Sequence, residues 1–293
     1  MDVPSPFLHD TAFLSERRAC EDRGPFALLI LNCNEVDTPA PSTTSAEPVC
    51  GMPPVMSLLH GISSFVICAD GGANRLYDMS GGAQKPDAIK GDLDSIRPQV
   101  LKHYEEAGVE IVKDPSQDMN DLEKCLWYLR QVEESSRSSR FDTVCVYGGL
   151  GGRFDQTMSS VSALFKFLDV FENIVLVDEE TTATLLRPCR APSGGLESEG
   201  GGRGGGDVHV IRPSPEVEGK LCGLIPMSGP CANVKTSGLK WNLKGEELCF
   251  GKLVSSSNEF SPGTEVRVSN DNFLVWTTHI SWSQNHEEDI AKK

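Results

Sequence analysis

Short apolar runs alternate with amphipathic segments over the first 180 residues of the chain. Five continuously apolar runs, each bounded by turn-forming residues, are typical of buried strands. They are Phe26–Cys33, Ser63–Asp70, Val109–Pro115, Asp142–Gly149 and Asn173–Glu180. Segments 120–134 and 156–168 instead repeat apolar residues along one helical face. Because buried strands that alternate with helices are typical of parallel sheets, the pattern predicts an α/β domain with a mainly parallel sheet over residues 25–180.

The pattern changes in the C-terminal part of the chain. From Asp207 onward, short β-type runs are separated by Gly, Pro and Asn turns at intervals of about ten residues. This spacing predicts an antiparallel β-sandwich domain over residues 181–285. The glycine-rich segment 192–206 is expected to be a flexible insertion in that domain. Residues 1–24 are expected to be an irregular N-terminal arm, and residues 286–293 a frayed tail.

Composition and charge exclude some functions. The 293 residues are 39% apolar and 24% charged, which is typical of a soluble globular protein. The 42 acidic residues outnumber the 27 basic ones, so the net charge is -15. A surface this acidic repels phosphate backbones and anionic lipid, so we expect binding neither to nucleic acid nor to a membrane.

The location is predicted from two further features of the sequence. No apolar stretch reaches the roughly 18 residues that span a bilayer, and the first 24 residues lack the apolar segment of a secretory signal. The ten cysteines form no CxxC pair. Both features predict a cytoplasmic protein with free thiols and without a zinc site.

Two carboxylates lie close together in the segment GDLDS. Asp92 and Asp94 are two residues apart, and in an extended or turn segment such side chains point the same way. Oxygen ligands of this kind suit Mg²⁺. A plain surface turn is the alternative, since Asp and Gly are common in turns.

A second group of polar residues precedes the helix predicted to begin near residue 120. Asn120 and Glu123 have the spacing of a helix capping box. Capping leaves Asp118 and Asp121 unexplained. Both are expected at the carboxyl edge of the parallel sheet, where ligands bind in such folds.

Two glycine-containing segments also follow predicted strands. In CADGGANRLYD, Asp70 ends a strand, and glycines 71 and 72 permit close approach of a ligand. An ordinary strand-to-helix turn is the alternative. In GGLGGRFDQ, four glycines and Arg153 resemble a phosphate cradle, yet residues 148–156 contain neither a P-loop nor a dinucleotide-binding motif.

The C-terminal part contains one aromatic residue of interest. Trp241, in TSGLKWNL, is suited to stacking on a flat cationic ligand. A core position is the alternative, because tryptophan in a strand usually packs inside. The segment Ser255–Asn258 offers hydroxyls and an amide, and it is equally typical of a turn.

Together these segments resemble the thiamine pyrophosphokinase family of the eukaryotic type. The matching pieces, in the family's order over about residues 26–280, are CADGGANRLYD, GDLDSIRP, QDMNDLEKCL, GGLGGRFDQ, CGLIP, TSGLKWNL and LVSSSN. The resemblance implies an α/β domain followed by a β-sandwich, assembled as a homodimer with active sites between subunits. It also implies transfer of the terminal diphosphate of ATP to thiamine, with Mg²⁺ as cofactor and AMP as the second product.

The resemblance assigns roles to individual residues. Asp92, Asp94 and Asp121 match the metal positions, and Asp94 and Asp121 are the two candidates for the base that accepts the proton of the thiamine hydroxyl. The residues predicted to bind ATP are Asp70, Gly71, Gly72, Asn74, Arg75, Asp92, Gly149, Arg153 and Asp155, with Gln156 nearby. Those predicted to bind thiamine are Gln117, Asp118 and Asp121, with Ser237, Trp241 and Asn258 contributed by the second subunit.

The sequence departs from the family pattern in three places, and two other functions stay open. Lys90 precedes the GDLDS segment where the family often has Asn, so it either contacts ATP or points to solvent. Asn120 replaces a common Thr, and segment 192–206 is an insertion. One alternative function is a thiamine- or nucleotide-binding module without catalysis. The other is a pyrophosphokinase that acts on a different hydroxyl.

Overall fold

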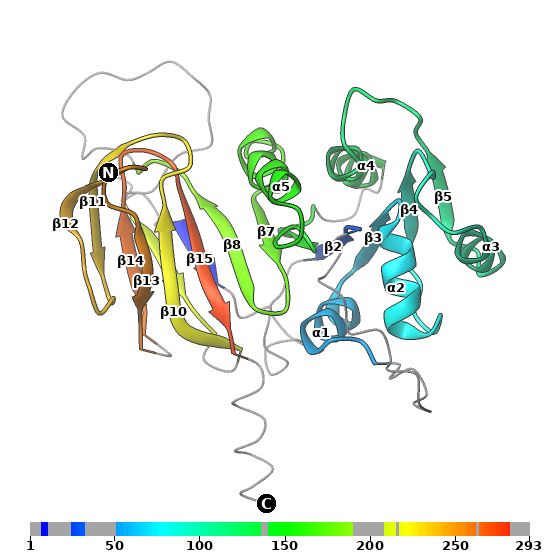
Figure 1. Ribbon diagram of the computed structural model, residues 1–293, viewed down its shortest axis with the longest axis horizontal. Helices are drawn as coiled ribbons and strands as arrows, with labels where there is room; N and C mark the ends of the chain where they lie inside the picture. The colour runs from blue at the N-terminus through cyan, green and yellow to red at the C-terminus, as the bar shows by residue number, and fades with distance from the viewer. Residues whose placement is uncertain are drawn as a thin grey trace, which may run out of the picture. The chain divides into compact units, whose positions relative to one another are not determined.

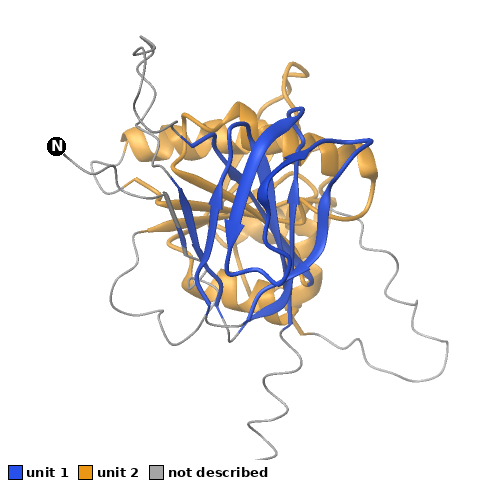
Figure 2. Ribbon diagram, turned by 90° about the vertical axis from the view of Figure 1, so that its left-hand side faces the viewer, with its two compact units in different colours: residues 1–23, 180–293 blue, residues 24–179 orange. Residues whose placement is uncertain are grey.

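The protein is described by a computed structural model (Figure 1). It describes residues 7–10, 25–32, 51–135, 140–189, 208–214, 217–261 and 264–281. The chain divides into two compact units, one of residues 24–179 and one of residues 180–293 together with 1–23 (Figure 2). The expected insertion 192–206 and tail 286–293 lie outside the described residues.

The unit of residues 24–179 is built on a parallel sheet. Its strand order is β7-β6-β2-β3-β4-β5, and each neighbouring pair is parallel. The strands are β2 (Phe26–Ile30), β3 (Phe65–Ala69), β4 (Ala88–Gly91), β5 (Glu110–Lys113), β6 (Thr143–Tyr147) and β7 (Asn173–Val177). Strand β2 is buried at every position, as expected for a strand covered on both faces. The five strands expected from the sequence are all present, and β4 is an additional one.

In the described part of this unit, five helices connect the strands. They are α1 (Pro54–Ile62), α2 (Gly72–Ser80), α3 (Pro98–Glu106), α4 (Asp121–Ser135) and α5 (Phe154–Lys166). Helices α2, α4 and α5 were expected from the sequence, and α4 and α5 bury residues of the apolar stripes seen there. In Figure 2 helices lie on both faces of the sheet, which confirms the predicted α/β architecture.

The cap of helix α4 explains where this helix begins. Oδ1 of Asn120 accepts a hydrogen bond from the backbone N–H of Glu123 at 2.9 Å, so Asn120 is the N-cap. The side chain of Glu123 pairs instead with Lys166 of α5 at 2.7 Å. Asn120 also donates to Ser159 of α5 at 3.0 Å. Side chains thus tie the N-terminus of α4 to two points along α5.

The second unit contains two sheets. One has the order β13-β10-β15-β8 and the other β1-β9-β14-β11-β12. The strands are β1 (Phe7–Asp10), β8 (Thr181–Leu186), β9 (His209–Arg212), β10 (Glu218–Ile225), β11 (Cys231–Ser237), β12 (Lys244–Leu248), β13 (Ser255–Glu259), β14 (Val266–Ser269) and β15 (Leu274–Ile280). Both sheets contribute to one apolar core, which includes Leu224, Val234 and Trp276. This arrangement is the predicted β-sandwich, antiparallel except for the β1–β9 pair.

Strand β1 corrects the expectation of an irregular arm over residues 1–24. Phe7–Asp10 pair in parallel with β9. Nε2 of His9 lies 2.9 Å from Nδ1 of His209. On the other side of the same ring, Nε2 of His209 lies 2.7 Å from the carbonyl oxygen of Arg187. Because a carbonyl only accepts, Nε2 of His209 is the protonated nitrogen, and its Nδ1 accepts from His9. A four-residue strand anchored by a distant histidine leaves no periodic signal in the sequence.

The histidine pair predicts a loss of stability in acid. Burial, helped in His9 by the neighbouring ring, lowers the pKa of His9 to about 3, and burial lowers that of His209 to about 4. Unfolded histidines titrate near 6.5, so below that pH the unfolded chain binds more protons than the folded one. We expect the free energy of unfolding to fall as the pH decreases from 6.5 toward 4. Urea unfolding at several pH values checks this, and His9→Leu should flatten the slope; an unchanged slope would contradict it.

Candidate active site

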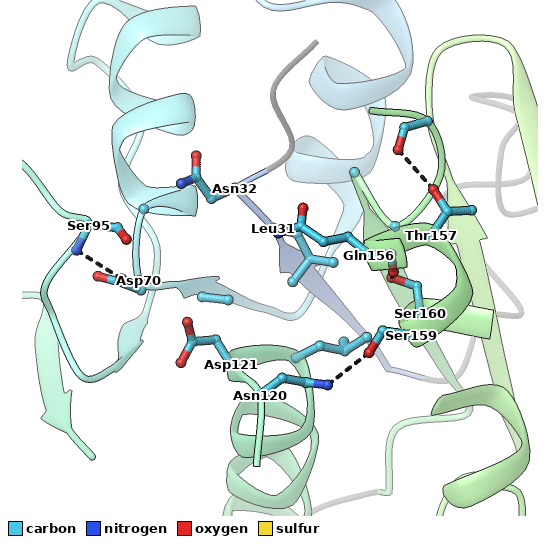
Figure 3. Close-up of a pocket in the computed structure, with 16 residues that line it drawn as sticks. Leu31, Asn32, Asp70, Ser95, Asn120, Asp121, Gln156, Thr157, Ser159 and Ser160 are labelled. Atoms are coloured by element: carbon cyan, nitrogen blue, oxygen red, sulfur yellow. Dashed lines mark hydrogen bonds between the residues drawn. The ribbon is translucent and has the colours of Figure 1, made fainter. Parts of the chain in front are cut away.

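A pocket opens at the carboxyl ends of the parallel strands. Its volume is about 240 Å³. It is lined by the residues that follow β2, β3 and β6 and by the first turns of α4 and α5 (Figure 3). Backbone N–H groups at helix N-termini favour anions, so both helices are suited to hold phosphate groups. The pocket lies where the sequence predicted a ligand site.

Three carboxylates gather beside this pocket. One oxygen atom from each of Asp70, Asp92 and Asp94 lies within 4.8 Å of the other two. Asp70 follows β3, while Asp92 and Asp94 follow β4, the strand that pairs with β3. The pairing of β3 with β4 therefore brings together residues that are more than 20 positions apart in the sequence.

The short loop after β4 places two of these carboxylates. Leu93 has a positive φ of 66°, which a leucine adopts only at a cost of about 1–2 kcal/mol. Within the loop, the backbone N–H of Asp94 donates to Oδ1 of Asp92 at 3.3 Å. The hydroxyl of Ser95 donates to Asp94 at 2.9 Å. A strained turn held by its own side chains indicates that the loop is built for function.

Asn74 of helix α2 holds the same loop. Its amide nitrogen donates to the carbonyl of Ser95 at 2.8 Å, and its amide oxygen accepts from the backbone N–H of Arg97 at 2.9 Å. The sequence assigned Asn74 to ATP binding, which stays a prediction. Both ends of its amide are engaged in positioning the loop that carries Asp92 and Asp94.

Asp70 fits a metal ligand by its surroundings. It is 2% exposed, and its Oδ2 accepts from the backbone N–H of Ser95 at 3.1 Å. In the described part of the chain its buried Oδ1 has no hydrogen-bond partner. Burial raises the pKa of Asp70, the hydrogen bonds from Ser95 lower it, and the charges of Asp121 and Asp92 raise it further. A divalent cation would satisfy the unpaired oxygen and offset these charges, so the three carboxylates suit Mg²⁺.

Asp121 has a different partner. It is the first residue of α4, it lines the pocket, and its carboxylate points into the same space as that of Asp70 (Figure 3). Its Oδ1 accepts a hydrogen bond from Nζ of Lys124 at 3.2 Å. The sequence placed Asp121 with Asp92 and Asp94 as metal ligands. That role stays a prediction, because the tight group of three contains Asp70 instead.

Two residues of the loop before α4 were predicted to bind thiamine. The amide nitrogen of Gln117 donates to Oδ2 of Asp92 at 3.2 Å, so Gln117 lies next to the carboxylate group. Asp118 accepts from the hydroxyl of Ser116 at 3.3 Å and is exposed. Both assignments stay predictions, with Gln117 the nearer of the two to the carboxylates.

Lys90 takes neither of the positions considered from the sequence. Its Nζ forms an ion pair with Asp114 at 3.0 Å, and it is not among the residues that line the pocket. The hydrogen bond from Lys90 is the main reason why the pKa of Asp114 is lowered. The lysine therefore ties β4 to the end of β5.

The glycine–arginine segment is divided between pocket and surface. Gly149, Gly151 and Gln156 line the pocket. Arg153 and Asp155 instead bind each other, with distances of 3.1 and 2.6 Å, and both side chains are 66% exposed. The prediction that Arg153 and Asp155 bind ATP is not tested by this arrangement. Binding through either side chain requires the exposed ion pair between them to separate.

The segment with Gly71 and Gly72 contributes both to the pocket wall and to the packing of α2. Gly71 lines the pocket. A Cβ atom at Gly72 would lie 2.2 Å from the carbonyl oxygen of Ile30, so this glycine allows α2 to approach β2. Arg75 stacks over the ring of Tyr147, 4.6 Å from its centre. Contact of Gly72 or Arg75 with ATP stays a prediction.

Several lining residues were not singled out as ligands from the sequence. Those with polar side chains are Asn32, Ser95, Asn120, Thr157, Ser159 and Ser160. Asn32 follows β2, and its position at a strand end already marks it in the sequence as a polar residue of interest, although no ligand was assigned to it. Lys124 was also missed, because a lysine within an amphipathic helix normally lies on its solvent face.

Trp241 in the second unit is exposed. Its side chain is 54% accessible, so a core position is excluded, and Nζ of Lys240 lies 4.4 Å from the ring centre. Asn258 is 4% exposed. Its amide accepts from the backbone N–H of Trp241 at 3.2 Å and donates to the carbonyl of the same residue at 2.9 Å. Asn258 thus fixes the backbone of Trp241. Ser237, the third residue predicted to bind thiamine from this unit, is the last residue of β11 and is exposed.

Gly91 offers a test of how closely the carboxylates are packed. A Cβ atom there would lie 2.7 Å from Cβ of Asp70 and 3.4 Å from Oδ1 of Asp121. We expect Gly91→Ala to lower the free energy of unfolding by about 1–3 kcal/mol, and to weaken metal binding as well. Denaturant unfolding and Mn²⁺ titration measure the two effects. Gly61→Ala is the control, since nothing lies within 4 Å of its added atom; equal stability losses would contradict the packing argument.

The arrangement defines a class of protein. Clustered carboxylates beside two helix N-termini, at the carboxyl edge of a parallel sheet, are typical of enzymes that bind a phosphorylated ligand through a divalent cation. Sequence models of "Thiamin pyrophosphokinase, catalytic domain" and "Thiamin pyrophosphokinase, vitamin B1 binding domain" match residues 57–176 and 208–275. The chain belongs to the thiamine pyrophosphokinase family.

Individual relatives agree with this assignment. Thiamine pyrophosphokinase 1 of Oryza sativa subsp. japonica is 35% identical, over 78% of this chain and 84% of the relative. Thiamine pyrophosphokinase 2 of Arabidopsis thaliana is 33% identical, over 96% and 94%. The crystal structure of yeast thiamin pyrophosphokinase has the same fold, with a TM-score of 0.71 at 22% identity over 96% of this chain and 93% of that one.

Proposed function

We propose that the protein transfers the terminal diphosphate of ATP to the hydroxyethyl group of thiamine, giving thiamine diphosphate and AMP. The observation that supports this most is the acidic pocket, which lies in the unit matched by the family's catalytic domain. In the reaction, a bond forms between the thiamine hydroxyl oxygen and the β-phosphorus of ATP. The bond from that phosphorus to the oxygen shared with the α-phosphorus breaks, and AMP leaves.

Asp70, Asp92 and Asp94 are the residues best placed to hold Mg²⁺. When bound, the cation neutralises the charge of the polyphosphate, which the carboxylates alone would repel. The predicted ligand set of Asp92, Asp94 and Asp121 differs from this group by one residue. Asp121 is within reach of the same space, as the proximity of its charge to Asp70 indicates.

The chain's own groups orient the reactants. Backbone N–H groups at the start of α4 and α5 are suited to the phosphate oxygens. The carboxylate of Asp121 or Asp94 accepts the proton that leaves the thiamine hydroxyl, since both are close to the pocket and a carboxylate can act as a general base. Gln117 and Asp118 face thiamine in this proposal.

Thiamine is a flat cation, and the exposed indole of Trp241 is suited to stack on it. Asn258 holds the backbone of Trp241 in place, and Ser237 adds a hydroxyl. We propose that the protein acts as a homodimer, in which these residues complete the active site of the other copy. Exposed apolar side chains in the same unit support an interface with a second copy: Leu221, Trp241 and Leu253.

A cytosolic location is part of the proposal. No disulfide joins the cysteines in the described part of the chain, as expected in a reducing compartment. Among the described residues, no helix has both the length and the apolar character needed to cross a membrane.

Thiamine-dependent release of AMP tests the function. The protein is mixed with ATP, thiamine and Mg²⁺, and the nucleotides are separated. We expect AMP to appear only when thiamine is present, to disappear with EDTA, and to return with excess Mg²⁺. Calorimetric binding of thiamine without release of AMP would support a binding module instead. Turnover with another hydroxyl compound, but not with thiamine, would support a different pyrophosphokinase.

A further inference from the structure

Lys124 is a buried cation near the start of helix α4, which borders the pocket. It is 2% exposed, and among the described residues it is the only buried lysine or arginine. A lysine is rarely buried unless it is paired, because removal of its charge from water is costly. A buried lysine so close to a pocket therefore needs a reason.

The contacts of Lys124 provide that reason. Its Nζ donates to Oδ1 of Asp121 at 3.2 Å and to the backbone carbonyl of Asp114 at 3.2 Å. The first bond reaches the residue at the start of the same helix. The second reaches the end of the neighbouring strand β5. The carboxylate of Asp121 is thus held between its helix and the sheet by one ammonium group.

The distribution of charge around the pocket distinguishes Asp121 from its neighbours. Asp70, Asp92 and Asp94 lie together as a group suited to a divalent cation. Asp121 forms its ion pair with Lys124, at 3.2 Å, while Lys90 pairs with Asp114 outside the pocket. Lys124 therefore supplies to Asp121 a fixed positive charge that belongs to the protein itself.

We propose that Lys124 is a positioning residue that fixes the carboxylate of Asp121 toward the reacting groups. The proposal rests on the proposed diphosphate transfer and takes Asp121, one of the two candidate bases, as the group that acts on the substrates. Lys124 itself does not touch them. Its loss leaves the other binding groups of ATP and thiamine in place but lets the carboxylate of Asp121 rotate, so turnover falls much more than affinity.

A purely structural role makes a different prediction. If Lys124 only anchors α4 to β5, its replacement lowers stability and affects turnover independently of Asp121. If it acts through Asp121, the two replacements are not additive. A double-mutant cycle separates these roles, because only the second predicts that Lys124 loses its importance once the carboxylate is absent.

The experiment compares Lys124→Met, Lys124→Arg, Asp121→Asn and the double variant Lys124→Met/Asp121→Asn. Initial rates of AMP formation are measured with thiamine, ATP and Mg²⁺, and thermal unfolding confirms that each variant is folded. We expect Lys124→Met to lower kcat by about 10- to 100-fold, with each KM within about threefold of wild type. Lys124→Arg should recover part of kcat, because it keeps the charge. On top of Asp121→Asn, the Lys124→Met change should cost less than about threefold further.

Lys90→Met is the matched control. It removes one ammonium group that also contacts Asp114, yet that group forms its ion pair with Asp114 and not with Asp121. Its kcat should stay within about twofold of wild type. Unchanged kcat in Lys124→Met, or losses that multiply in the double variant, would overturn the positioning role. Wild-type protein that forms no AMP would instead overturn the proposed function, and this outcome is distinguishable because it precedes any comparison of variants.

Discussion

Replacement of Asp92 by asparagine is expected to lower kcat about a thousandfold, because it removes one charge from the carboxylate group that suits Mg²⁺. Asp92 is held by the backbone N–H of Asp94 and the amide of Gln117, and these bonds lower its pKa, so it is ionised at neutral pH. Asparagine has nearly the same shape, and its oxygen keeps the bond from the backbone N–H of Asp94. A flip of the Gln117 amide then allows the Gln117 oxygen to accept a hydrogen bond from the new amide nitrogen. We therefore expect the melting temperature to change by less than about 3 °C.

The measurement combines steady-state rates with thermal unfolding. Asp142→Asn is the matched control. Asp142 is exposed and precedes β6 at its amino end, whereas the pocket lies at the carboxyl ends of the strands. Its kcat should equal that of wild type. Full activity of Asp92→Asn would remove the metal role that we propose for this carboxylate.

Trp241→Ala is expected to raise the KM for thiamine by about 10- to 30-fold and to change the KM for ATP by less than about twofold. Stacking of a cation on an indole contributes up to about 2 kcal/mol, which corresponds to this range. The ring is exposed, so its removal leaves no cavity in the core. The melting temperature should therefore hardly change.

Phe250→Ala is the control for Trp241. Phe250 is also an exposed aromatic residue of the same unit, at 59% accessibility, and it lies outside the segments assigned to thiamine. We expect both KM values to stay near wild type in this variant. If Trp241→Ala raised the two KM values equally, the indole would not be the thiamine-stacking group.

The fold could be predicted from sequence where the hydrophobic pattern is long or continuous. The five expected strands of the parallel sheet and helices α4 and α5 are all present. Helix α1 was missed because its run PVMSLLHGI is almost entirely apolar, which hides the helical period. Strand β4 was missed because its four residues, AIKG, include a lysine and only two clearly apolar side chains.

The candidate site was predicted to a similar degree. Asp92 and Asp94 could be proposed as metal ligands because their spacing is local, and that role stays a prediction. The inclusion of Asp70 depends on the pairing of β3 with β4, which is a long-range feature. The roles of Asn74 and Lys124 depend on which way their side chains turn, and residue type alone does not determine this. Positioning residues are therefore the ones that sequence reasoning misses.

The central claim is the transfer of an intact diphosphate by this acidic pocket. ATP labelled in both its β- and γ-phosphates is incubated with the protein, thiamine and Mg²⁺, and the products are separated. The account predicts equal β and γ label in thiamine diphosphate, with one AMP for each molecule formed. Label from the γ-phosphate alone, in thiamine monophosphate and with ADP as the second product, would contradict it.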